Sequence, residues 1–282
     1  MRRRSVNSSA RLSAPTMAAS SASSLPAAAS AAPSLTPPLF PLPLSLVRSS
    51  LLSLDAVCFD VDSTVSGEEG IDVLAEFLGK GDEVKAYTNQ AMNGAVPFEV
   101  SLRDRLDLMR PTAAEVAACV ASNPPSFSPG FEPFLAWMRN WFAGRNGGRT
   151  LPVFLVSGGF RPLIDPLRLR LGLQPECVFA NEMIWDPESG AYKGFDATQP
   201  TSRSGGKARA IESLVAAHGF KHVLMVGDGA TDLEAAPPAR IVVGYGGVVA
   251  RPTVEAKAHY FVRSWEQLRG IMEEEQKESS PP

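Results

Sequence analysis

Cysteine is scarce in this chain of 282 residues, and long hydrophobic runs are missing. The three cysteines, Cys58, Cys119 and Cys177, are scattered and never occur at C-x-x-C spacing. This pattern fits reduced thiols better than a disulfide framework or a zinc site. No apolar run approaches the roughly 20 residues that a membrane-spanning helix needs. A net charge of −3 gives no reason to expect a nucleic acid partner.

Acidic residues are absent from the first fifty positions, which contain five arginines. Removing these five of the 27 basic residues leaves 22 against 30 acidic ones, so the rest of the chain is acidic. A segment rich in arginine and serine and free of acids is typical of an organelle transit peptide. Its abundant serine favours the plastid stroma over the mitochondrion. A generic disordered tail is the alternative.

We therefore expect residues 1–50 to lie outside the fold, as a transit peptide or a disordered segment. Prolines exclude a helix from the stretch PSLTPPLFPLPLSL, residues 33–46. Cleavage is expected between residues 30 and 55.

Four short apolar runs, each followed by small polar residues, recur along the rest of the chain. They are AVCFDV (56–61), PVFLVSGG (152–159), HVLMVGDG (222–229) and RIVVGYGG (240–247). Such runs are typical of strands buried on both faces. Segments of helical length, such as residues 161–172 and 205–219, lie between them. The alternation predicts an α/β fold with a Rossmann-like parallel sheet, which binds ligands at the carboxyl ends of its strands.

The interval between the first two predicted strands, about 90 residues, is far longer than a strand–helix–strand crossover needs. Four segments in it show apolar residues at helical spacing: EGIDVLAEFLG, PFEVSLRDRLDLM, PTAAEVAACVAS and FEPFLAWMRNWFAG. We predict that residues 68–145 form an inserted helical cap on a catalytic core of residues 51–67 and 146–282. Alternating residues around ESG, within residues 180–196, predict a small β-hairpin flap.

Two aspartates, Asp60 and Asp62, come at the tip of the first predicted strand. Residues two apart on a strand point the same way, so both carboxylates can face one pocket. Asp228 and Asp232 follow a strand that we expect to be its neighbour. Close carboxylates repel one another unless they share a proton or a cation, and an oxygen-rich cluster without thiol or imidazole suits Mg²⁺. Caps and turns explain any one of these aspartates, but they do not easily explain two pairs.

Other residues at the same edge of the sheet indicate phosphoryl transfer. Lys207 stands at the start of a predicted helix, and Ser157, Gly158 and Gly159 end the second predicted strand. A lysine and a cation neutralise a phosphate dianion that a carboxylate would otherwise repel. A hydroxyl with neighbouring backbone N–H groups holds phosphate oxygens.

Asp60 and Asp62 fit complementary roles in that reaction. We predict that Asp60 attacks phosphorus and forms an aspartyl-phosphate. Asp62 protonates the leaving alkoxide and then takes a proton from the water that hydrolyses the intermediate. Each signal is modest alone, but DxDST, SGG, GGK and GDGxxD in this order form a strong joint signal.

Together DVDST, SGG, Lys207 and GDGATD resemble the four motifs of the haloacid dehalogenase superfamily of phosphatases. The resemblance covers nearly the whole chain after residue 55. The segments FDVDSTVSGEEGID, AMNGAVPF, VFLVSGGFR, FDATQPTSRSGGK and GDGATDLEAAPPA are similar to the phosphoserine phosphatase family. This resemblance implies a Rossmann-like core with a helical cap, dependence on Mg²⁺, and hydrolysis of O-phospho-L-serine to L-serine and phosphate. It also implies that the chain catalyses the last step of serine synthesis, in which phosphoserine is converted to serine.

The resemblance assigns roles to single residues. The implied metal ligands are the Asp60 carboxylate, the Asp62 backbone carbonyl and Asp228, with Asp232 nearby. The implied phosphate-holding positions are Ser157, Gly158 and Lys207. The other implied substrate contacts are Glu69 and Arg105 for the ammonium and carboxylate of the serine moiety, Met92 as a cover, and Thr231 and Arg251.

Plainer interpretations exist for several of these residues. An acid such as Glu69 is common at a helix start, and Arg105 could pair with Asp104 or Glu99 on the cap surface. Met92 would be ordinary core packing. The spacing of Trp137 and Trp141 predicts a contact in the core of the cap.

One position departs from the family pattern. Asn93 stands where the family usually has a glycine, in AMGGAVPF, beside the phosphate region, so the resemblance counts it among the substrate-binding positions. Asparagine tolerates a positive φ better than most residues, so we expect activity to be retained.

Other functions remain open at this level. The same chemistry could serve another small phosphomonoester, or the fold could belong to a binding protein without catalysis. An ion-pump phosphorylation domain is disfavoured because membrane spans are absent and Asp62 is placed to speed hydrolysis. The residue pattern also leaves monomer and homodimer open.

Overall fold

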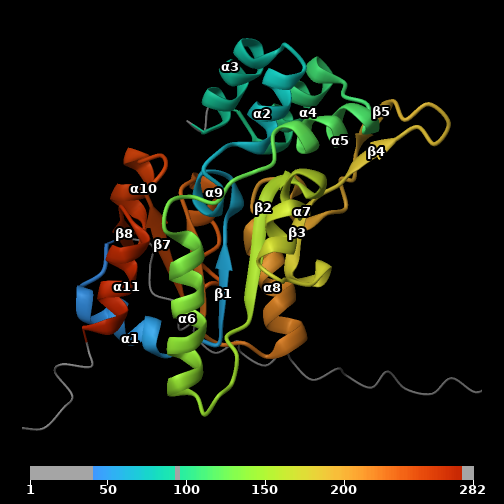
Figure 1. Cartoon of the computed structure of the whole chain (residues 1–282). Helices are drawn as coiled ribbons and strands as arrows, with labels where there is room; N and C mark the ends of the chain where they lie inside the picture. Colours follow the sequence, from blue (N-terminus) through green and yellow to red (C-terminus); the bar gives the residue numbers. More distant parts are fainter. Residues whose placement is uncertain (1–40, 93–95, 275–282) are drawn as a thin grey trace, which may run out of the picture. The chain divides into compact units, whose positions relative to one another are not determined.

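The centre of the fold is a parallel sheet of six strands. The computed structural model describes residues 41–92 and 96–274. Within them the strand order is β3 (Val178–Asn181), β2 (Val153–Phe160), β1 (Ala56–Phe59), β6 (Val223–Gly227), β7 (Ile241–Tyr245) and β8 (Tyr260–Val262) (Figure 1). The α/β fold with a Rossmann-like parallel sheet is confirmed, and β1 and β6 are neighbours as predicted. The sequence does not predict β3 and β8, which are the two short edge strands.

Alternate residues of β1 pack on opposite faces of the sheet. Val57 and Phe59 join a cluster with residues of α6 (Phe131–Arg145), α7 (Arg161–Arg170) and α11 (Trp265–Glu273). Ala56 and Cys58 join a second cluster with residues of α8 (Gly206–His218), α9 (Ala230–Leu233) and α10 (Pro252–Lys257). Helices on both faces bury the whole strand, which explains its continuous apolar run.

A helix, α1 (Leu44–Leu52), precedes the first strand. It corrects the expectation that residues 1–50 lie outside the fold. Val47 and Leu51 are fully buried in the cluster that contains Phe59, and the Leu42 N–H donates to the carbonyl of His259 at 2.7 Å. The helix begins directly after Pro43, the last proline of the stretch 33–46, so the exclusion of a helix from that stretch is wrong for its last three residues, Leu44 to Leu46.

Four helices form a separate cluster: α2 (Gly70–Phe77), α3 (Gly81–Met92), α4 (Phe98–Met109) and α5 (Ala113–Ser122). Their apolar stripes meet at residues such as Leu74, Leu106 and Val116. The two chain segments that lead into and out of these helices run side by side. Ser66 and Phe127 form an antiparallel bridge there, and the Gly67 N–H donates to the Ser126 carbonyl at 3.1 Å.

Helix α6 packs on the sheet, although we expected it in the cap. Phe131, Leu135 and Met138 lie in the cluster of Phe59. Trp137 and Trp141 pack against that same cluster, so their predicted place in the cap core is wrong. The apolar spacing indicates a helix but does not say which partner its face meets. We propose that the cap extends from about residue 67 to residue 126, between the two sides of the Ser66–Phe127 bridge.

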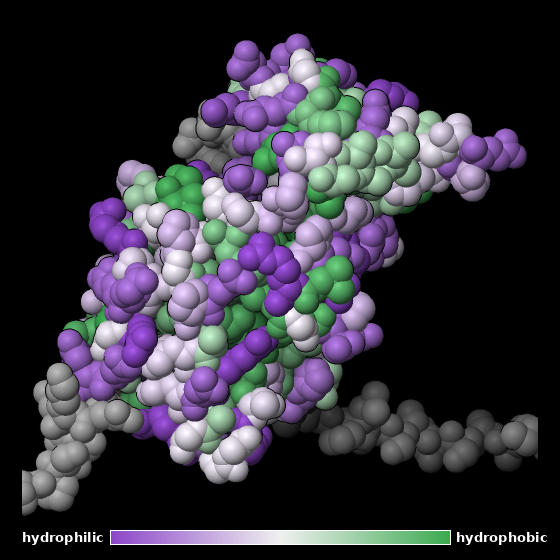
Figure 2. Space-filling model, in the orientation of Figure 1, coloured by the Kyte–Doolittle hydropathy of each residue, from purple (hydrophilic) through white to green (hydrophobic). Residues whose placement is uncertain are grey.

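The predicted flap is a two-stranded antiparallel hairpin of β4 (Met183–Trp185) and β5 (Tyr192–Phe195). Its Met183 and Tyr192 join the cluster of the cap helices. Figure 2 shows hydrophilic residues scattered over the viewed face and a pale green area over the alanine-rich α5. Among the helices of residues 41–92 and 96–274, none is long and apolar enough to cross a membrane.

Candidate active site

The loop after β1 carries Asp60 and Asp62. Asp60 has an extended backbone and caps the short turn η1 (Val61–Val65), where its Oδ1 accepts the Val61 N–H at 2.7 Å. Inside the turn, Ser63 adopts the left-handed region with φ 53°, which is unusual for a residue with a side chain. This tight turn keeps Asp60 and Asp62 on the wall of one cavity at the strand tips, together with Lys207.

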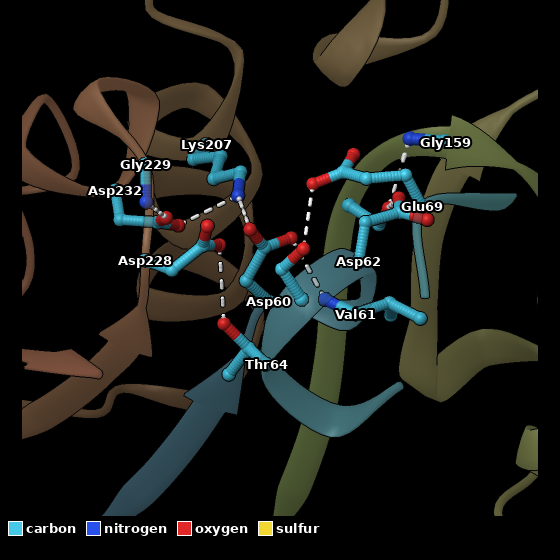
Figure 3. Close-up of polar contacts among 12 residues, drawn as sticks. Asp60, Val61, Asp62, Thr64, Glu69, Gly159, Lys207, Asp228, Gly229 and Asp232 are labelled. Atoms are coloured by element: carbon cyan, nitrogen blue, oxygen red, sulfur yellow. Dashed lines mark hydrogen bonds and ion pairs between the residues drawn. The ribbon is translucent and has the colours of Figure 1, made fainter. Parts of the chain in front are cut away.

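Three carboxylates and one ammonium group meet at the tips of β1 and β6 (Figure 3). Carboxylate oxygens of Asp60, Asp228 and Asp232 lie within 4.8 Å of one another. Lys207 Nζ lies 2.8 Å from Asp60 Oδ2 and 2.6 Å from Asp232 Oδ1. Asp62 is not in this group, so three of the four predicted carboxylates converge and the fourth points elsewhere.

Burial governs the charges of this cluster. Burial and the charge of Asp232 raise the pKa of Asp60, and the same two causes raise the pKa of Asp228 to about 6. Burial opposes the charge on Lys207, but the carboxylates of Asp232 and Asp60 outweigh it and raise the lysine pKa. Lys207 and the Arg251 guanidinium, which pairs with Asp228, together face three carboxylates, so negatively charged oxygens remain in excess. That donor set fits a hard divalent cation, because such ions take oxygen ligands.

Asp62 turns away from the cluster toward the second strand. Its Oδ1 accepts the Gly70 N–H at 2.7 Å, and its Oδ2 accepts the Ser157 hydroxyl at 3.3 Å. Burial raises the pKa of Asp62, while the Gly70 N–H and Lys207 lower it. The carboxyl group is thus held at the edge of the cavity in an environment that favours retention of a proton.

The tip of β2 brings backbone close to the cavity. The strand runs three residues past Ser157, whose hydroxyl accepts the Gly159 N–H at 2.8 Å. A Cβ atom on Gly158 would lie 2.7 Å from the ring of Phe98, and one on Gly159 would lie 2.8 Å from Asp62 Oδ2. A side chain at either position would therefore displace Phe98 or Asp62, and both positions line the cavity.

Charged residues of opposite sign face the cavity from the cap. Glu69, before α2, accepts the Ser63 hydroxyl at 2.7 Å, and burial with the charges of Asp62 and Asp228 raises its pKa to about 8. Arg105 of α4 is 5% exposed and lines the same cavity. Burial lowers the pKa of Arg105, and the negative charges of Asp72 and Glu69 offset part of this by raising it. The alternative of a surface ion pair for Arg105 is therefore wrong.

Arg251 joins the cap to the cluster of carboxylates. Its Nε donates to Asp228 Oδ2 at 2.8 Å, and its terminal nitrogen lies 3.3 Å from Glu69 Oε1. Thr231, in the first turn of α9, lines the cavity as well. Met92 is the last residue of α3, but its side chain lies outside the described part of the structure, as does the whole of Asn93.

Two contributions are not apparent from the sequence. The Nδ2 of the fully buried Asn181 donates to the Gly158 carbonyl at 2.8 Å, and its Oδ1 accepts the Thr201 hydroxyl at 3.0 Å. This side chain joins the tip of β2 to the loop that leads to Lys207. Asn181 was missed because it ends β3, a strand that the sequence does not predict. Phe98 is the second contribution: it lies on the cavity wall, whereas its apolar spacing in the sequence indicates only packing between helices.

The sequence is similar to known phosphatases over most of its length. A family model described as haloacid dehalogenase-like hydrolase matches residues 57–237. The phosphoserine phosphatase of Bos taurus is 44% identical over 230 residues, which are 82% of this chain and 98% of that protein. The chloroplastic phosphoserine phosphatase of Arabidopsis thaliana is 44% identical over 218 residues, 77% of this chain and 71% of that protein.

A solved structure shares the fold. The phospho-aspartyl intermediate analogue of a phosphoserine phosphatase superposes with a TM-score of 0.65 at 28% identity, covering 77% of this chain and 99% of that one. The sequence identity and the fold agree with the order of the four motifs and with their placement around the carboxyl edge of the sheet. The chain therefore belongs to the haloacid dehalogenase-like hydrolases and, within them, to the phosphoserine phosphatase family.

Proposed function

We propose that this chain hydrolyses O-phospho-L-serine to L-serine and phosphate through an aspartyl-phosphate. The observation that carries the proposal is the set of charged side chains that line one cavity. Its floor holds Asp60 against Lys207, and its cap side holds Glu69 and Arg105. The first pair suits a phosphate monoester, and the second pair suits the ammonium and carboxylate of a free amino acid.

We assign one residue to each step of the reaction. An oxygen of Asp60 bonds to phosphorus while the bond from phosphorus to the serine oxygen breaks. Asp62 gives its proton to that oxygen, so L-serine leaves as a neutral alcohol. A water molecule then attacks phosphorus, and Asp62 takes a proton from this water. The bond between phosphorus and the Asp60 oxygen breaks, which regenerates the Asp60 carboxylate and releases inorganic phosphate. Lys207 offsets the negative charge of the phosphoryl group in both steps.

The relatives belong to metal-dependent phosphatases, and we propose Mg²⁺ as the ion for this chain. Asp60, Asp228 and the Asp62 backbone carbonyl would hold it, with Asp232 nearby; the bound ion lowers the repulsion between a carboxylate and a phosphate dianion. The proposal is supported by three carboxylates that lie within 4.8 Å of one another and include no histidine or cysteine.

Replacement of one carboxylate tests the ion. Asp228→Asn should weaken Mg²⁺ binding at least about tenfold, because a charged oxygen ligand becomes neutral. Isothermal titration calorimetry of the substrate-free protein measures this. Asp82→Asn, on the exposed surface of α3, is the matched control and should bind as the unchanged chain does. Equal affinity of the Asp228 and Asp82 variants would exclude Asp228 as a ligand.

The identity of the substrate is tested on the cap. Glu69→Gln and Arg105→Met should each raise KM for phosphoserine by about 10- to 100-fold, since each removes one charged hydrogen bond. Hydrolysis of p-nitrophenyl phosphate, which has neither ammonium nor carboxylate, should change much less. An equal loss with both substrates would favour the alternative function, a phosphatase for another small phosphomonoester.

We also propose import into the plastid stroma, with the mitochondrion as the alternative. The proposal is supported by the acid-free, arginine- and serine-rich first fifty residues and by the chloroplastic Arabidopsis relative. Because Leu42 and α1 belong to the fold, cleavage should occur before Leu42. Import into isolated chloroplasts and mitochondria, followed by N-terminal sequencing, tests this. Retention of residues 1–41 after import into chloroplasts would contradict it.

A further inference from the structure

Ser128 lies where the chain returns from the cap, and it contacts three parts of the fold. Its side chain is 1% exposed. Its hydroxyl donates to the Thr64 carbonyl at 2.5 Å and accepts the indole N–H of Trp265 at 3.0 Å. Its backbone N–H donates to the Val65 carbonyl at 2.8 Å. One buried serine thus connects the returning segment, the loop after β1 and the start of α11.

On the side of the core, the hydrogen bond of Ser128 to Trp265 ends in closely packed aromatic rings. Trp265 is fully buried, stacks on Tyr245 with ring centroids 4.1 Å apart, and stacks on Phe134 at 5.0 Å. Aromatic rings packed in this way bury large areas and leave little freedom to their neighbours. The Ser128 hydroxyl is therefore held in place by the core.

The near side of the network reaches the cluster of carboxylates. Thr64 is fully buried, and its hydroxyl lies 3.3 Å from Asp228 Oδ1. The next residue, Val65, donates its N–H to the Asp60 carbonyl at 3.4 Å. A hydrogen bond from Ser128 to the Thr64 carbonyl therefore acts on the turn that orients both Asp60 and Asp228. Figure 3 shows Thr64 beside these two carboxylates.

We infer that Ser128 is a positioning residue, which fixes the turn after Asp60 against the aromatic core and so holds the Asp60–Asp228 pair in place for cation binding and attack. The role has a second consequence for the cap. Both segments of the Ser66–Phe127 bridge are tied to the core at Val65 and Ser128, so we expect cap motion to begin beyond the bridge.

Three substitutions separate positioning from general stability. Ser128→Ala removes the donor to Thr64. Trp265→Phe removes the indole N–H but keeps the Ser128 hydroxyl and an aromatic ring. Ser128→Thr keeps the hydroxyl. For each variant, kcat is measured at saturating phosphoserine and Mg²⁺, Mg²⁺ affinity by calorimetry without substrate, and stability by urea unfolding.

The expected result is a split between the two kinds of variant. Ser128→Ala should lower kcat and Mg²⁺ affinity each by about tenfold, as is usual for the loss of a group that orients metal ligands, with a smaller change in KM. Trp265→Phe should lower stability at least as much but change kcat and Mg²⁺ affinity less than about threefold. Ser128→Thr should restore both quantities. Should Ser128→Ala not fold, Ser128→Cys, which keeps a weak donor of similar size, should show the same split.

Unchanged Mg²⁺ affinity and kcat in Ser128→Ala would overturn the inference, and so would losses in Ser128→Ala and Trp265→Phe that simply follow stability. The inference rests on the proposed function, but the two fail differently. Absence of turnover by the unaltered chain counts against the proposed function. Calorimetry on Ser128→Ala measures the positioning role without any turnover.

Discussion

Asp60→Asn should lower phosphoserine hydrolysis by at least about ten-thousandfold, which is typical for the loss of a nucleophile that forms a covalent intermediate. A neutral amide oxygen is a poor nucleophile toward phosphorus. Release of inorganic phosphate at saturating substrate and Mg²⁺ measures the effect. The fold should persist, because an asparagine oxygen can still accept the Val61 N–H that the Asp60 carboxylate accepts at 2.7 Å.

The carboxylates of the native cluster repel one another, so the structure also predicts how Asp60→Asn changes stability. Asp60 faces Lys207 at 2.8 Å but also shares its surroundings with Asp228 and Asp232. Asp60→Asn weakens the pairing with Lys207, which keeps Asp232 at 2.6 Å, but it also relieves repulsion from Asp228 and Asp232, so the net change in stability should be small. Loss of activity together with loss of stability would therefore point to misfolding, and a matched urea-unfolding curve excludes it.

The opposite outcome would also be informative. Asp82→Asn, on the exposed surface of α3, controls for the loss of a single carboxylate and should be fully active. Undiminished hydrolysis by Asp60→Asn would exclude the aspartyl-phosphate and leave direct attack by water. Absence of hydrolysis in the unaltered chain with Mg²⁺ would instead favour the catalytically silent binding protein.

The sequence predicts the centre of the site because parallel strands share one direction. The apolar run of β1 identifies a buried strand, and the polar residues that follow it must lie at the carboxyl edge. The same reasoning places Asp228 and Ser157 at that edge, and the structure puts all three tips around one cavity. Direction and periodicity are local properties, so a single sequence contains them.

Features that depend on contacts between residues far apart in the sequence cannot be predicted in this way. The apolar stripe of α6 could pack on a cap or on a sheet equally well. Only the folded chain shows that Phe131 packs on Phe59 of β1, with ring centroids 5.3 Å apart. The short helix α1 is stable because the core covers Val47, not because its own sequence favours a helix. Ser128 and Asn181 act through backbone carbonyls, which every residue has, so no motif marks their targets.

Asp62→Asn should lower kcat for phosphoserine by about 100- to 10,000-fold, the range for loss of a general acid–base. The substitution keeps the shape of the side chain, and an asparagine oxygen can still accept the Gly70 N–H that now lies 2.7 Å from Asp62 Oδ1. The amide has no proton to give to the serine alkoxide and cannot take one from water. KM should therefore change little.

A substrate with a good leaving group separates the two duties of Asp62. The p-nitrophenolate ion needs no proton to leave, so the Asp62→Asn variant should still transfer the phosphoryl group to Asp60. Hydrolysis of the intermediate needs a base to activate water, so it should become the slow step. Stopped-flow absorbance should then show a burst of p-nitrophenolate equal to the enzyme concentration, and mass spectrometry of the quenched sample should show one added phosphoryl group. A steady rate without burst or adduct would mean that another group activates the water, since Asp62 would then serve only as the acid.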